Sequence, residues 1–314
     1  MSKIENIAVI GAGLMGHGIA QVFACSGHPV WLVDTDKGIL KQAKEQVAKN
    51  LSQMVQHGIN FKDDVTKIVE RISTATELAP ACEGCDFVIE AVYENLELKQ
   101  QVFADLDRFC QGDTILCSNT SVIAITEIAE GATRRERIAG THWWNPPYLI
   151  PLVEVVRARD TADWCIDATY DLLKRVGKHP VRVHKDVPGF VGNRLQHALW
   201  REAFAIVDDE ICDPATVDEV IRKGFGLRLP TLGPVENADM IGLDLTLAIH
   251  DYILKYLNAS PTPSTTLRSR VEHKDLGFKT GKGFQDWSEA QVIASRQRLS
   301  NYLMKVMAEE MNRT

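Results

Sequence analysis

The first 34 residues contain a strand, a glycine-rich turn, a helix and a second strand in direct succession. The β-branched run at 7–10 predicts a buried strand, and the motif GAGLMG follows at 11–16. Apolar residues then recur at helical spacing, and 30–33 is a second apolar run that ends at Asp34. This order predicts a βαβ unit, in which the two strands are parallel and the connection between them is right-handed.

Each position of the GAGLMG motif has a physical role if the turn binds a dinucleotide. Gly11 permits a tight turn, Gly13 lets the backbone approach a pyrophosphate, and Gly16 lets helix and strand pack closely. The start of the helix offers N–H groups and the positive end of its dipole to the phosphates. We therefore predict that Gly11, Gly13, Leu14, Met15 and Gly16 bind the cofactor.

Asp34, 18 residues past Gly16, indicates which dinucleotide fits. An acid at the end of the second strand accepts hydrogen bonds from the adenosine ribose hydroxyls and repels a 2′-phosphate. No arginine follows directly, and Asp36 adds another acid. The expected cofactor is NAD rather than NADP.

Apolar runs alternate with helical patterns up to about residue 187. Such alternation predicts an α/β fold, a Rossmann-type doubly wound sheet that is mostly parallel. A polar stretch from Lys37 to Ile72 has helical spacing and predicts an inserted helical hairpin with Gly58 near its turn. The expected later strands are 87–92, 114–118, 138–144, 152–156 and 181–183, and 94–109 is an expected helix.

The pattern changes after Gly189, where no convincing strand remains. Helical spacing predicts helices at 191–211, 243–257 and 289–311. We therefore expect two domains. Residues 1–187 would form an NAD-binding Rossmann domain with the inserted hairpin, and residues 188–314 an all-helical domain that serves the substrate and dimerisation.

The segment THWWNPPYLIPLVEVV at 141–156 carries the strongest candidate for proton chemistry. His142 precedes an Asn-Pro-Pro turn, and Glu154 lies twelve residues later within an apolar, strand-like run. A lone acid is costly to bury unless it is paired. Because prolines let the chain double back, His142 can reach the carboxylate and act as a base near neutral pH. The alternative is a core histidine with a stray strand acid.

Composition excludes several other classes of protein. A net charge of −7, from 35 basic and 42 acidic residues, argues against nucleic acid as the partner. Seven scattered cysteines do not form a disulfide framework, and the single CxxC at 82–85 lacks further ligands for zinc, so we expect no metal. With no signal peptide and no run long enough for a membrane helix, the expected protein is cytoplasmic, without a membrane partner, and acts on a small molecule.

With these residues in place, the chain resembles the 3-hydroxyacyl-CoA dehydrogenase family. The resemblance runs from Ile7 to Trp287 and rests on several stretches together. They are IAVIGAGLMGHGIAQVFA, VIEAVYENLELKQ, SNTS, the segment from His142 to Glu154, DVPGFVGNRL and FKTGKGF. The resemblance implies a homodimeric NAD-dependent oxidoreductase of fatty acid metabolism that converts a 3-hydroxyl to a ketone.

The resemblance also implies roles for particular residues. His142 would be the catalytic base and Glu154 its buried partner, while Ser121 and Asn193 would hydrogen-bond the base or the reacting oxygen. Ser121 and Asn193 could instead be helix caps, and Lys99 a surface charge. The residues implied to surround the cofactor are Ala91, Glu94, Lys99, Asn119 and Asn145, with Glu94 and Lys99 at a ribose, Ala91 packed close to NAD and Asn145 at the nicotinamide end.

Two departures from the typical family pattern leave the substrate open. Two tryptophans and NPPY stand at 143–148, where acyl-CoA members have two phenylalanines and a single proline. This spelling is similar to relatives that act on free hydroxy acids, such as gulonate 3-dehydrogenase (lambda-crystallin) and carnitine dehydrogenase, and to a pyridine-ring dehydrogenase of vitamin B6 breakdown. The hairpin turn at 56–60 also lacks the lysines that can meet CoA phosphates.

Three substrate hypotheses and one non-catalytic hypothesis therefore stand. A 3-hydroxyacyl-CoA is the first, and the segment GFKTGKGFQDW, which resembles acyl-CoA members, supports it. A free 3-hydroxy acid is the second, and Arg194, Arg201 or Arg228 could hold its carboxylate. The third is an aromatic hydroxymethyl or aldehyde compound. A crystallin-like protein without turnover is disfavoured by the intact pair of His142 and Glu154.

The role of Asp34 can be tested directly. Replacement Asp34→Ala should relax the preference for NAD over NADP, because the carboxylate that repels a 2′-phosphate is removed. Dissociation constants of NADH and NADPH for both proteins measure the ratio. An unchanged ratio of the two dissociation constants would mean that Asp34 does not distinguish the ribose hydroxyl of NAD from the 2′-phosphate of NADP.

Overall fold

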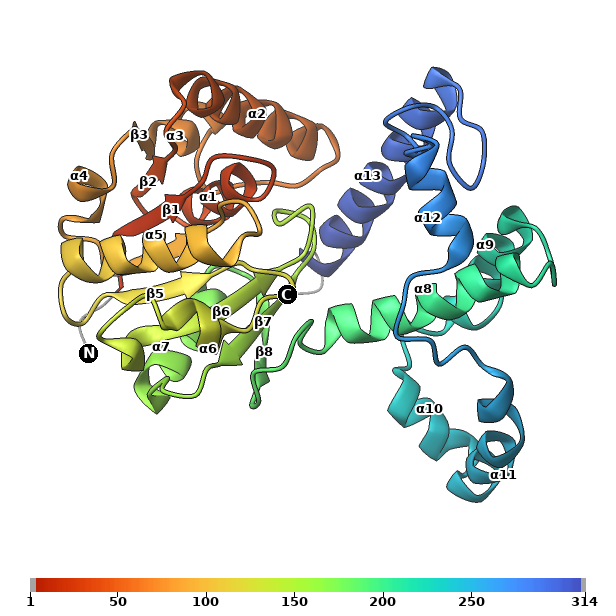
Figure 1. Cartoon of the computed structure of the whole chain (residues 1–314). Coiled ribbons are helices and arrows are strands. Elements are labelled where there is room, and N and C mark those ends of the chain that lie inside the picture. The colour runs from red at the N-terminus through yellow and green to blue at the C-terminus, as the bar shows by residue number, and fades with distance from the viewer. Residues whose placement is uncertain (1–3, 312–314) are drawn as a thin grey trace. The chain divides into compact units, whose positions relative to one another are not determined.

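The computed structural model describes residues 4–311, and its elements are labelled in Figure 1. The chain divides into two compact units. The first contains the described residues up to Asn193 together with those from Leu299 onward, and the second spans Arg194–Arg298. The predicted division at 187/188 differs from these units, because residues 188–193 and the described residues from Leu299 onward belong to the first one. The domain boundary itself stays a prediction.

An eight-stranded sheet in the order β3-β2-β1-β4-β5-β6-β7-β8 forms the centre of the first unit. Neighbouring strands are parallel except for the pair of β6 and β7, which is antiparallel. The strands are β1 Ile7–Ile10, β2 Val30–Val33, β3 Ile72–Ala75, β4 Phe87–Glu90, β5 Ile115–Ser118, β6 Ile138–Trp143, β7 Leu152–Arg157 and β8 His179–Val183.

Helices cover both faces of this sheet, so its central strands β1, β4 and β5 are buried on both sides, as parallel sheets require. Side chains of β1 show the alternation: Ile7 and Val9 belong to one apolar cluster, and Ala8 and Ile10 to a second. The helices of the first unit are α1 Gly16–Cys25, α2 Lys37–Gln56, α3 Val65–Glu70, α4 Leu78–Cys82, α5 Leu96–Phe109, α6 Ile125–Ala129, the 3-10 turn η1 Arg135–Arg137 and α7 Asp163–Arg175.

The predicted fold class is confirmed, and β3 is the strand that the prediction missed. The stretch from Lys37 to Ile72 does contain a helical pair, α2 and α3, with Gly58 in the intervening turn at φ +82°. Its last residue, however, begins strand β3 at the edge of the sheet. Within β3 only Ile72 is buried, so an edge strand this short carries no apolar pattern from which to predict it.

The Asn-Pro-Pro segment reverses the chain between β6 and β7, and the Asn145–Pro146 peptide bond is cis. The two strands therefore run antiparallel, and their register places His142 directly opposite Glu154. Side chains of directly paired residues lie on the same face of the sheet. The turn thus decides which strand residues can meet.

The second unit consists of helices, with isolated bridges at residues 277–286 as its only β structure among the described residues. The expected helix at 289–311 is present as α13, and from Leu299 onward it belongs to the first unit. The elements that begin in or lie within 192–311 are α8 Gly192–Asp208, α9 Pro214–Lys223, η2 Phe225–Leu227, α10 Pro234–Ile241, α11 Leu243–Ile253, η3 Leu254–Tyr256, α12 Thr265–Glu272 and α13 Glu289–Met311.

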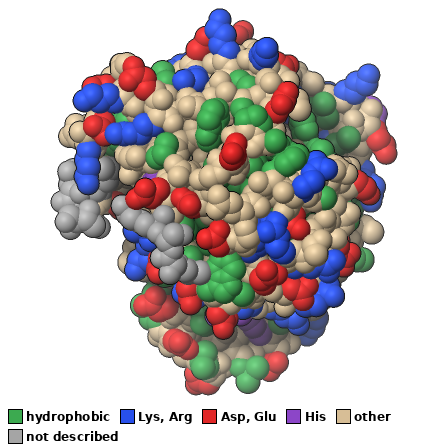
Figure 2. Space-filling model, turned by 90° about the vertical axis from the view of Figure 1, so that its left-hand side faces the viewer, with side chains coloured by type: hydrophobic (Ala, Val, Ile, Leu, Met, Phe, Trp, Pro, Cys, Tyr) green, Lys and Arg blue, Asp and Glu red, His purple; other side chains and the backbone are tan. Residues whose placement is uncertain are grey.

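Basic and acidic side chains are interspersed on the face shown in Figure 2, and no large patch of one sign stands out among its coloured side chains. Such a face does not provide the continuous positive surface that phosphate backbones need. Among residues 4–311, no helix combines the length and the apolar character required to cross a bilayer.

Candidate active site

The glycine turn between β1 and α1 leaves no room for side chains where the helix meets the strand. A Cβ on Gly16 would lie 1.7 Å from the carbonyl oxygen of Gly11. Around Gly13, in contrast, a Cβ would meet nothing within 4 Å, and the residue is exposed. The backbone at Gly13 is therefore open to a ligand, while Gly16 brings the start of α1 against the turn. Leu14 is 66% exposed, and Met15 is half-buried.

Asp34 follows β2 and faces the same turn. One of its carboxylate oxygens accepts a hydrogen bond from the N–H of Ala12 at 2.9 Å, and the other from the N–H of Asp36 at 3.1 Å. Each carboxylate oxygen can accept further hydrogen bonds, so ribose hydroxyls could still bind. On the other side, a Cβ on Gly11 would lie 2.6 Å from the carbonyl oxygen of Ala91. The open glycine, the acid and the close backbone at Ala91 together fit NAD.

His142 and Glu154 form a buried hydrogen-bonded pair. Nδ1 of His142 lies 2.7 Å from Oε2 of Glu154, and the two side chains are 4% and 1% exposed. An ionised carboxylate only accepts hydrogen bonds. Nδ1 therefore donates the proton of this hydrogen bond, which leaves Nε2 as the nitrogen that can accept a proton.

The second oxygen of Glu154 holds the start of α8. Oε1 accepts hydrogen bonds from the backbone N–H groups of Val191 at 2.9 Å and of Gly192 at 3.0 Å. Burial by itself would raise the pKa of Glu154. The hydrogen bonds from His142, Gly192 and Val191 outweigh it, so the pKa lies below its ordinary value. Glu154 is thus ionised, and both of its carboxylate oxygens accept hydrogen bonds.

Asn193 brings a side-chain amide to the other nitrogen of the imidazole. Its Nδ2 donates to the carbonyl oxygen of Ser121 at 2.8 Å and lies 3.5 Å from Nε2 of His142. Ser121 is exposed, and helix α6 is capped at Ala124 instead. The structure therefore brings Asn193 and the backbone of Ser121 to His142, and the alternative of Ser121 as the cap of α6 is wrong.

Three further residues surround this pair: Trp144, which the sequence marked as a departure from the family pattern, Phe190 and Gly192. The rings of Trp144 and Phe190 lie 5.2 and 5.7 Å from the His142 ring. Phe190 has a positive φ of 48° and is 1% exposed. A Cβ on Gly192 would lie 2.4 Å from Trp144 and 3.2 Å from Glu154. The glycines of DVPGFVGNRL were visible in the sequence, but nothing there showed what they approach.

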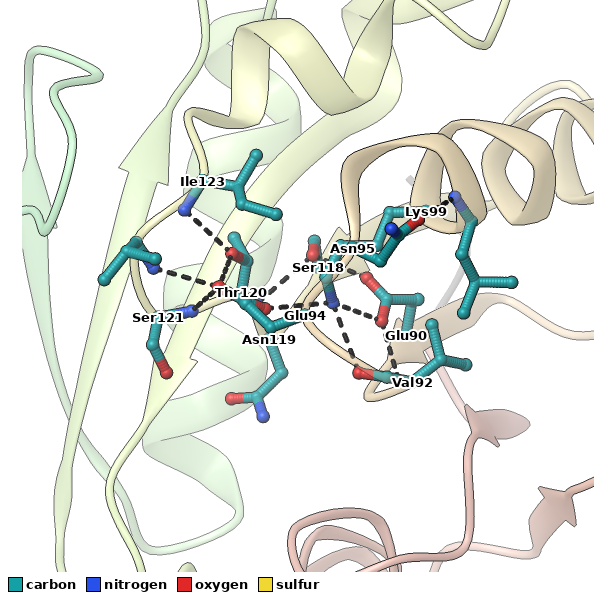
Figure 3. A network of polar contacts seen from close by, with 12 residues as sticks. Glu90, Val92, Glu94, Asn95, Lys99, Ser118, Asn119, Thr120, Ser121 and Ile123 are labelled. Atoms are coloured by element: carbon teal, nitrogen blue, oxygen red, sulfur yellow. Dashed lines mark hydrogen bonds and ion pairs between the residues drawn. The ribbon is translucent and has the colours of Figure 1, made fainter. Parts of the chain in front are cut away.

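Lys99 is buried, so the alternative of a surface charge is wrong. Its ammonium lies 2.7 Å from Oε1 of Glu90 and 3.4 Å from Oε2 of Glu94, as the network in Figure 3 shows. Glu90, at the end of β4, also accepts hydrogen bonds from the Ser118 hydroxyl at 2.6 Å and the Val92 N–H at 2.7 Å. Sequence reasoning missed Glu90, because the acid ends an otherwise apolar strand without a visible partner.

Glu94 holds the loop after β5. It accepts hydrogen bonds from the Thr120 hydroxyl at 2.5 Å and from the N–H groups of Ser121 and Val122 at 2.9 and 3.1 Å. Burial would raise the pKa of Glu94, but the Thr120 hydroxyl, the charge of Lys99 and the two N–H groups lower it below its ordinary value. The network thus fixes the loop whose Ser121 carbonyl receives Asn193.

The two asparagines of the predicted cofactor set have different environments. Asn119 is 9% exposed, and its side-chain oxygen accepts a hydrogen bond from the N–H of Trp143 at 3.0 Å. That bond ties the end of β5 to β6 one residue after His142. Asn145 is exposed and therefore accessible to a ligand.

The CxxC residues Cys82 and Cys85 are buried free thiols, and Cys85 donates to the carbonyl of Ala81. Burial, together with the neighbouring Cys110 and Asp86, raises the pKa of Cys85 to about 12, so its thiol stays protonated. Within residues 4–311, no three His, Cys, Asp or Glu side chains gather as metal ligands would.

The doubly wound sheet, the glycine turn with its acid and the buried pair of histidine and glutamate define a class, the NAD-dependent oxidoreductases with a Rossmann domain. Family comparisons specify the class further. Residues 6–187 match the model described as 3-hydroxyacyl-CoA dehydrogenase, NAD binding domain, and residues 189–287 match that of the C-terminal domain of the same enzyme. The chain belongs to the 3-hydroxyacyl-CoA dehydrogenase family and is an NAD-dependent dehydrogenase, as its sequence predicts.

The relatives include enzymes of two kinds. Mitochondrial hydroxyacyl-coenzyme A dehydrogenase of Rattus norvegicus is 38% identical, with 90% of each chain covered. The 5-formyl-3-hydroxy-2-methylpyridine 4-carboxylate 5-dehydrogenase of Mesorhizobium japonicum is 32% identical, with 96% of this chain and 97% of the relative covered.

Solved structures show the same two kinds. A 5-formyl-3-hydroxy-2-methylpyridine 4-carboxylic acid 5-dehydrogenase, described as an NAD+ dependent dismutase, has a TM-score of 0.90 at 31% identity over 98% of this chain and 99% of its own. The (S)-3-hydroxybutyryl-CoA dehydrogenase of Ralstonia eutropha has a TM-score of 0.75 at 34% identity over 91% and 100%.

The ionised state of Glu154 predicts how stability depends on pH. A carboxyl whose pKa is depressed in the fold stabilises it above the unfolded pKa, about 4.3 for glutamate, and this contribution is lost as the pH falls through the lower folded value. The difference in unfolding free energy between the wild type and Glu154→Gln should therefore shrink below about pH 4.3. Urea unfolding from neutral pH downward measures it, and a constant difference would contradict the assignment.

The buried ammonium of Lys99 predicts a large loss of stability in Lys99→Met. Removing it leaves the carboxylate of Glu90 buried without its cation, which typically costs about 3–5 kcal/mol. The matched control is Lys41→Met, because Lys41 is 80% exposed and its contact with Glu45 is 3.9 Å long; such pairs contribute about 0–1 kcal/mol. Equal losses in urea unfolding of the two variants would show that the buried network does not stabilise the fold.

Proposed function

We propose that this protein oxidises a hydroxyl group to a carbonyl with NAD, and that His142 is the base. The observation that carries the proposal is the 2.7 Å bond from Nδ1 of His142 to Glu154, which directs the lone pair of Nε2 away from the carboxylate. A base in this state removes a hydroxyl proton near neutral pH, a contribution of typically ~10²–10⁴-fold to the rate. Bound NAD supplies the hydride acceptor.

Glu154 keeps the imidazole in the tautomer that the reaction needs and stabilises the imidazolium that forms. Its two backbone hydrogen bonds, from Val191 and Gly192, hold the carboxylate in place while His142 changes charge. The acid itself keeps its charge throughout, in agreement with a pKa below the ordinary range.

Asn193 is proposed to hydrogen-bond the reacting oxygen. Its Nδ2 lies 3.5 Å from Nε2 of His142, so a substrate hydroxyl placed at the base also reaches the amide. The Ser121 carbonyl orients that amide at 2.8 Å. The exposed Ser121 hydroxyl is proposed as a second contact to the substrate, as the family resemblance implies.

The first substrate class that we propose is a 3-hydroxyacyl-CoA. Both domains of the family match along 6–287, and relatives named for CoA substrates are up to 38% identical. In such a substrate the hydroxyl lies on carbon 3, and its oxidation yields the 3-keto compound. The homodimer, the cytoplasmic location and the role in fatty acid metabolism remain predictions.

A second candidate is a compact hydroxy acid or a pyridine-ring compound without CoA. The specific observation that favours it is the hairpin turn after α2, where Ile59 is 1% exposed and no lysine lies at residues 56–60. Phosphates bind to cations or to free N–H groups, and this turn presents neither a lysine nor an arginine side chain for them. The TM-score of 0.90 with the pyridine dehydrogenase supports the same candidate.

A substrate panel tests the proposal. NADH formation is followed with (S)-3-hydroxybutyryl-CoA, free 3-hydroxybutyrate, L-gulonate, L-carnitine and a pyridine compound with a hydroxymethyl or formyl group. We expect the protein to oxidise compounds of one class only. The proposal of a 3-hydroxyacyl-CoA substrate is supported only if the CoA ester is the preferred compound. In His142→Ala, turnover of that substrate should fall by a factor of about 100 or more, while NAD affinity changes little.

Normal turnover in His142→Ala would remove His142 from the mechanism. Tight NAD binding with no turnover of any panel compound would contradict both substrate candidates. Gln56→Lys and Asn60→Lys, both at exposed positions of the hairpin turn, are useful companions, because added cations there should lower the KM of a CoA ester and leave that of a free acid unchanged.

A further inference from the structure

The end of α13 adds a packed segment to the first unit beyond the matched family domains. The C-terminal family match ends at residue 287, and α13 begins at Glu289. In the part that belongs to the first unit, Met304 is 4% exposed, whereas the neighbouring Lys305 is 74% exposed. Flexible methionine side chains fill irregular gaps between elements, so Met304 identifies the side on which the helix is anchored.

Met304 belongs to a small apolar cluster that joins segments far apart in the sequence. Its other buried members are Met54 in the last turn of α2, Ile59 in the hairpin turn, and Leu149. Met54 is 2% exposed, Ile59 1% and Leu149 5%. Partly buried residues pack around them: Phe61, Tyr148, Leu303, Met307 and Ala308.

Leu149 connects this cluster to the turn that begins with Asn145. The backbone N–H groups of Leu149 and Ile150 both donate to the carbonyl of Pro146 at 3.0 Å. Pro146 directly follows Asn145, so Asn145 and the apolar anchor Leu149 lie within one closed turn. Well-packed interiors transmit small displacements rather than absorb them, and a shift of Leu149 moves the backbone next to Asn145.

Further contacts hold the same turn at Pro147 and Ile150. The ammonium of Lys178 donates to the carbonyl of Pro147 and, at 2.9 Å, to that of Ile150. On α1, Gly18 approaches so closely that a Cβ there would lie 2.6 Å from Cγ of Pro147. The helix that begins at the glycine turn therefore touches the turn that begins with Asn145. The cluster around Met304 supplies the apolar anchor of this assembly.

We propose that Met304 is a positioning residue for the cofactor, acting through Leu149 on the turn that carries Asn145. The inference rests on the proposed placement of Asn145 at the nicotinamide end of NAD. The adenosine and pyrophosphate ends are held elsewhere, by Asp34 and the glycine turn. Loss of the anchor at Met304 therefore weakens recognition of the nicotinamide end and leaves that of the adenosine end intact.

The test compares binding of NAD+ and of ADP-ribose, which lacks the nicotinamide, by calorimetry on the full-length protein. Met304→Ala should raise the Kd of NAD+ about tenfold, because misplacement of a positioning group is costly. The Kd of ADP-ribose should stay within about twofold. Met304→Leu, which keeps the buried volume, should behave as the wild type, and Lys305→Ala is the control on the exposed side of the same helix turn.

Equal weakening of both ligands, or no change in either, would overturn the proposal, as would wild-type affinities that do not differ between NAD+ and ADP-ribose. If Met304→Ala does not fold, Met307→Ala at the edge of the cluster is measured instead, with the same selective loss for NAD+ expected. Failure of the proposed reaction is seen separately, as absence of turnover in the substrate panel, because these binding measurements require no turnover.

Discussion

The buried carboxylate of Glu154 is the interaction on which the candidate site depends. One of its oxygens binds His142 from the neighbouring strand, and the other binds the N–H groups of Val191 and Gly192 at the start of α8. An unpaired carboxylate at this depth would be strongly destabilising. The requirement that both oxygens be satisfied therefore brings β6, β7 and α8 together, and the same requirement places Asn193 beside the imidazole.

A second buried charge organises the neighbouring loop. Lys99 lies between Glu90 and Glu94, and Glu94 in turn holds the backbone of Ser121. Because the Ser121 carbonyl receives Asn193, the two polar networks meet at one amide. The interior of a Rossmann sheet is otherwise apolar. The buried polar groups of these two networks are therefore stable only when every donor and acceptor has its hydrogen-bond or ion-pair partner.

The sequence predicted those parts of the site that depend on residues close together in the chain. The order of strand, GAGLMG, helix, strand and Asp34 predicted both the fold class and NAD, because the spacing alone restricts the backbone. The pairing of His142 with Glu154 was predictable from two facts, an acid in an apolar strand and two prolines that reverse the chain. Strand β3 was not predictable, since an edge strand with one buried residue has no pattern.

What the sequence by itself determined is thus the Rossmann fold and the cofactor class, which rest on residues near each other in the chain, and the family, which rests on several short motifs together. Only the tertiary structure decided that Lys99 is buried against Glu90 and that Gly192 packs closely against Trp144. It also decided that Met304 shares an apolar cluster with Leu149. The physical reason is that spacing along a chain constrains local backbone geometry. Partners of buried charges and apolar side chains depend instead on which distant segments the sheet brings into contact.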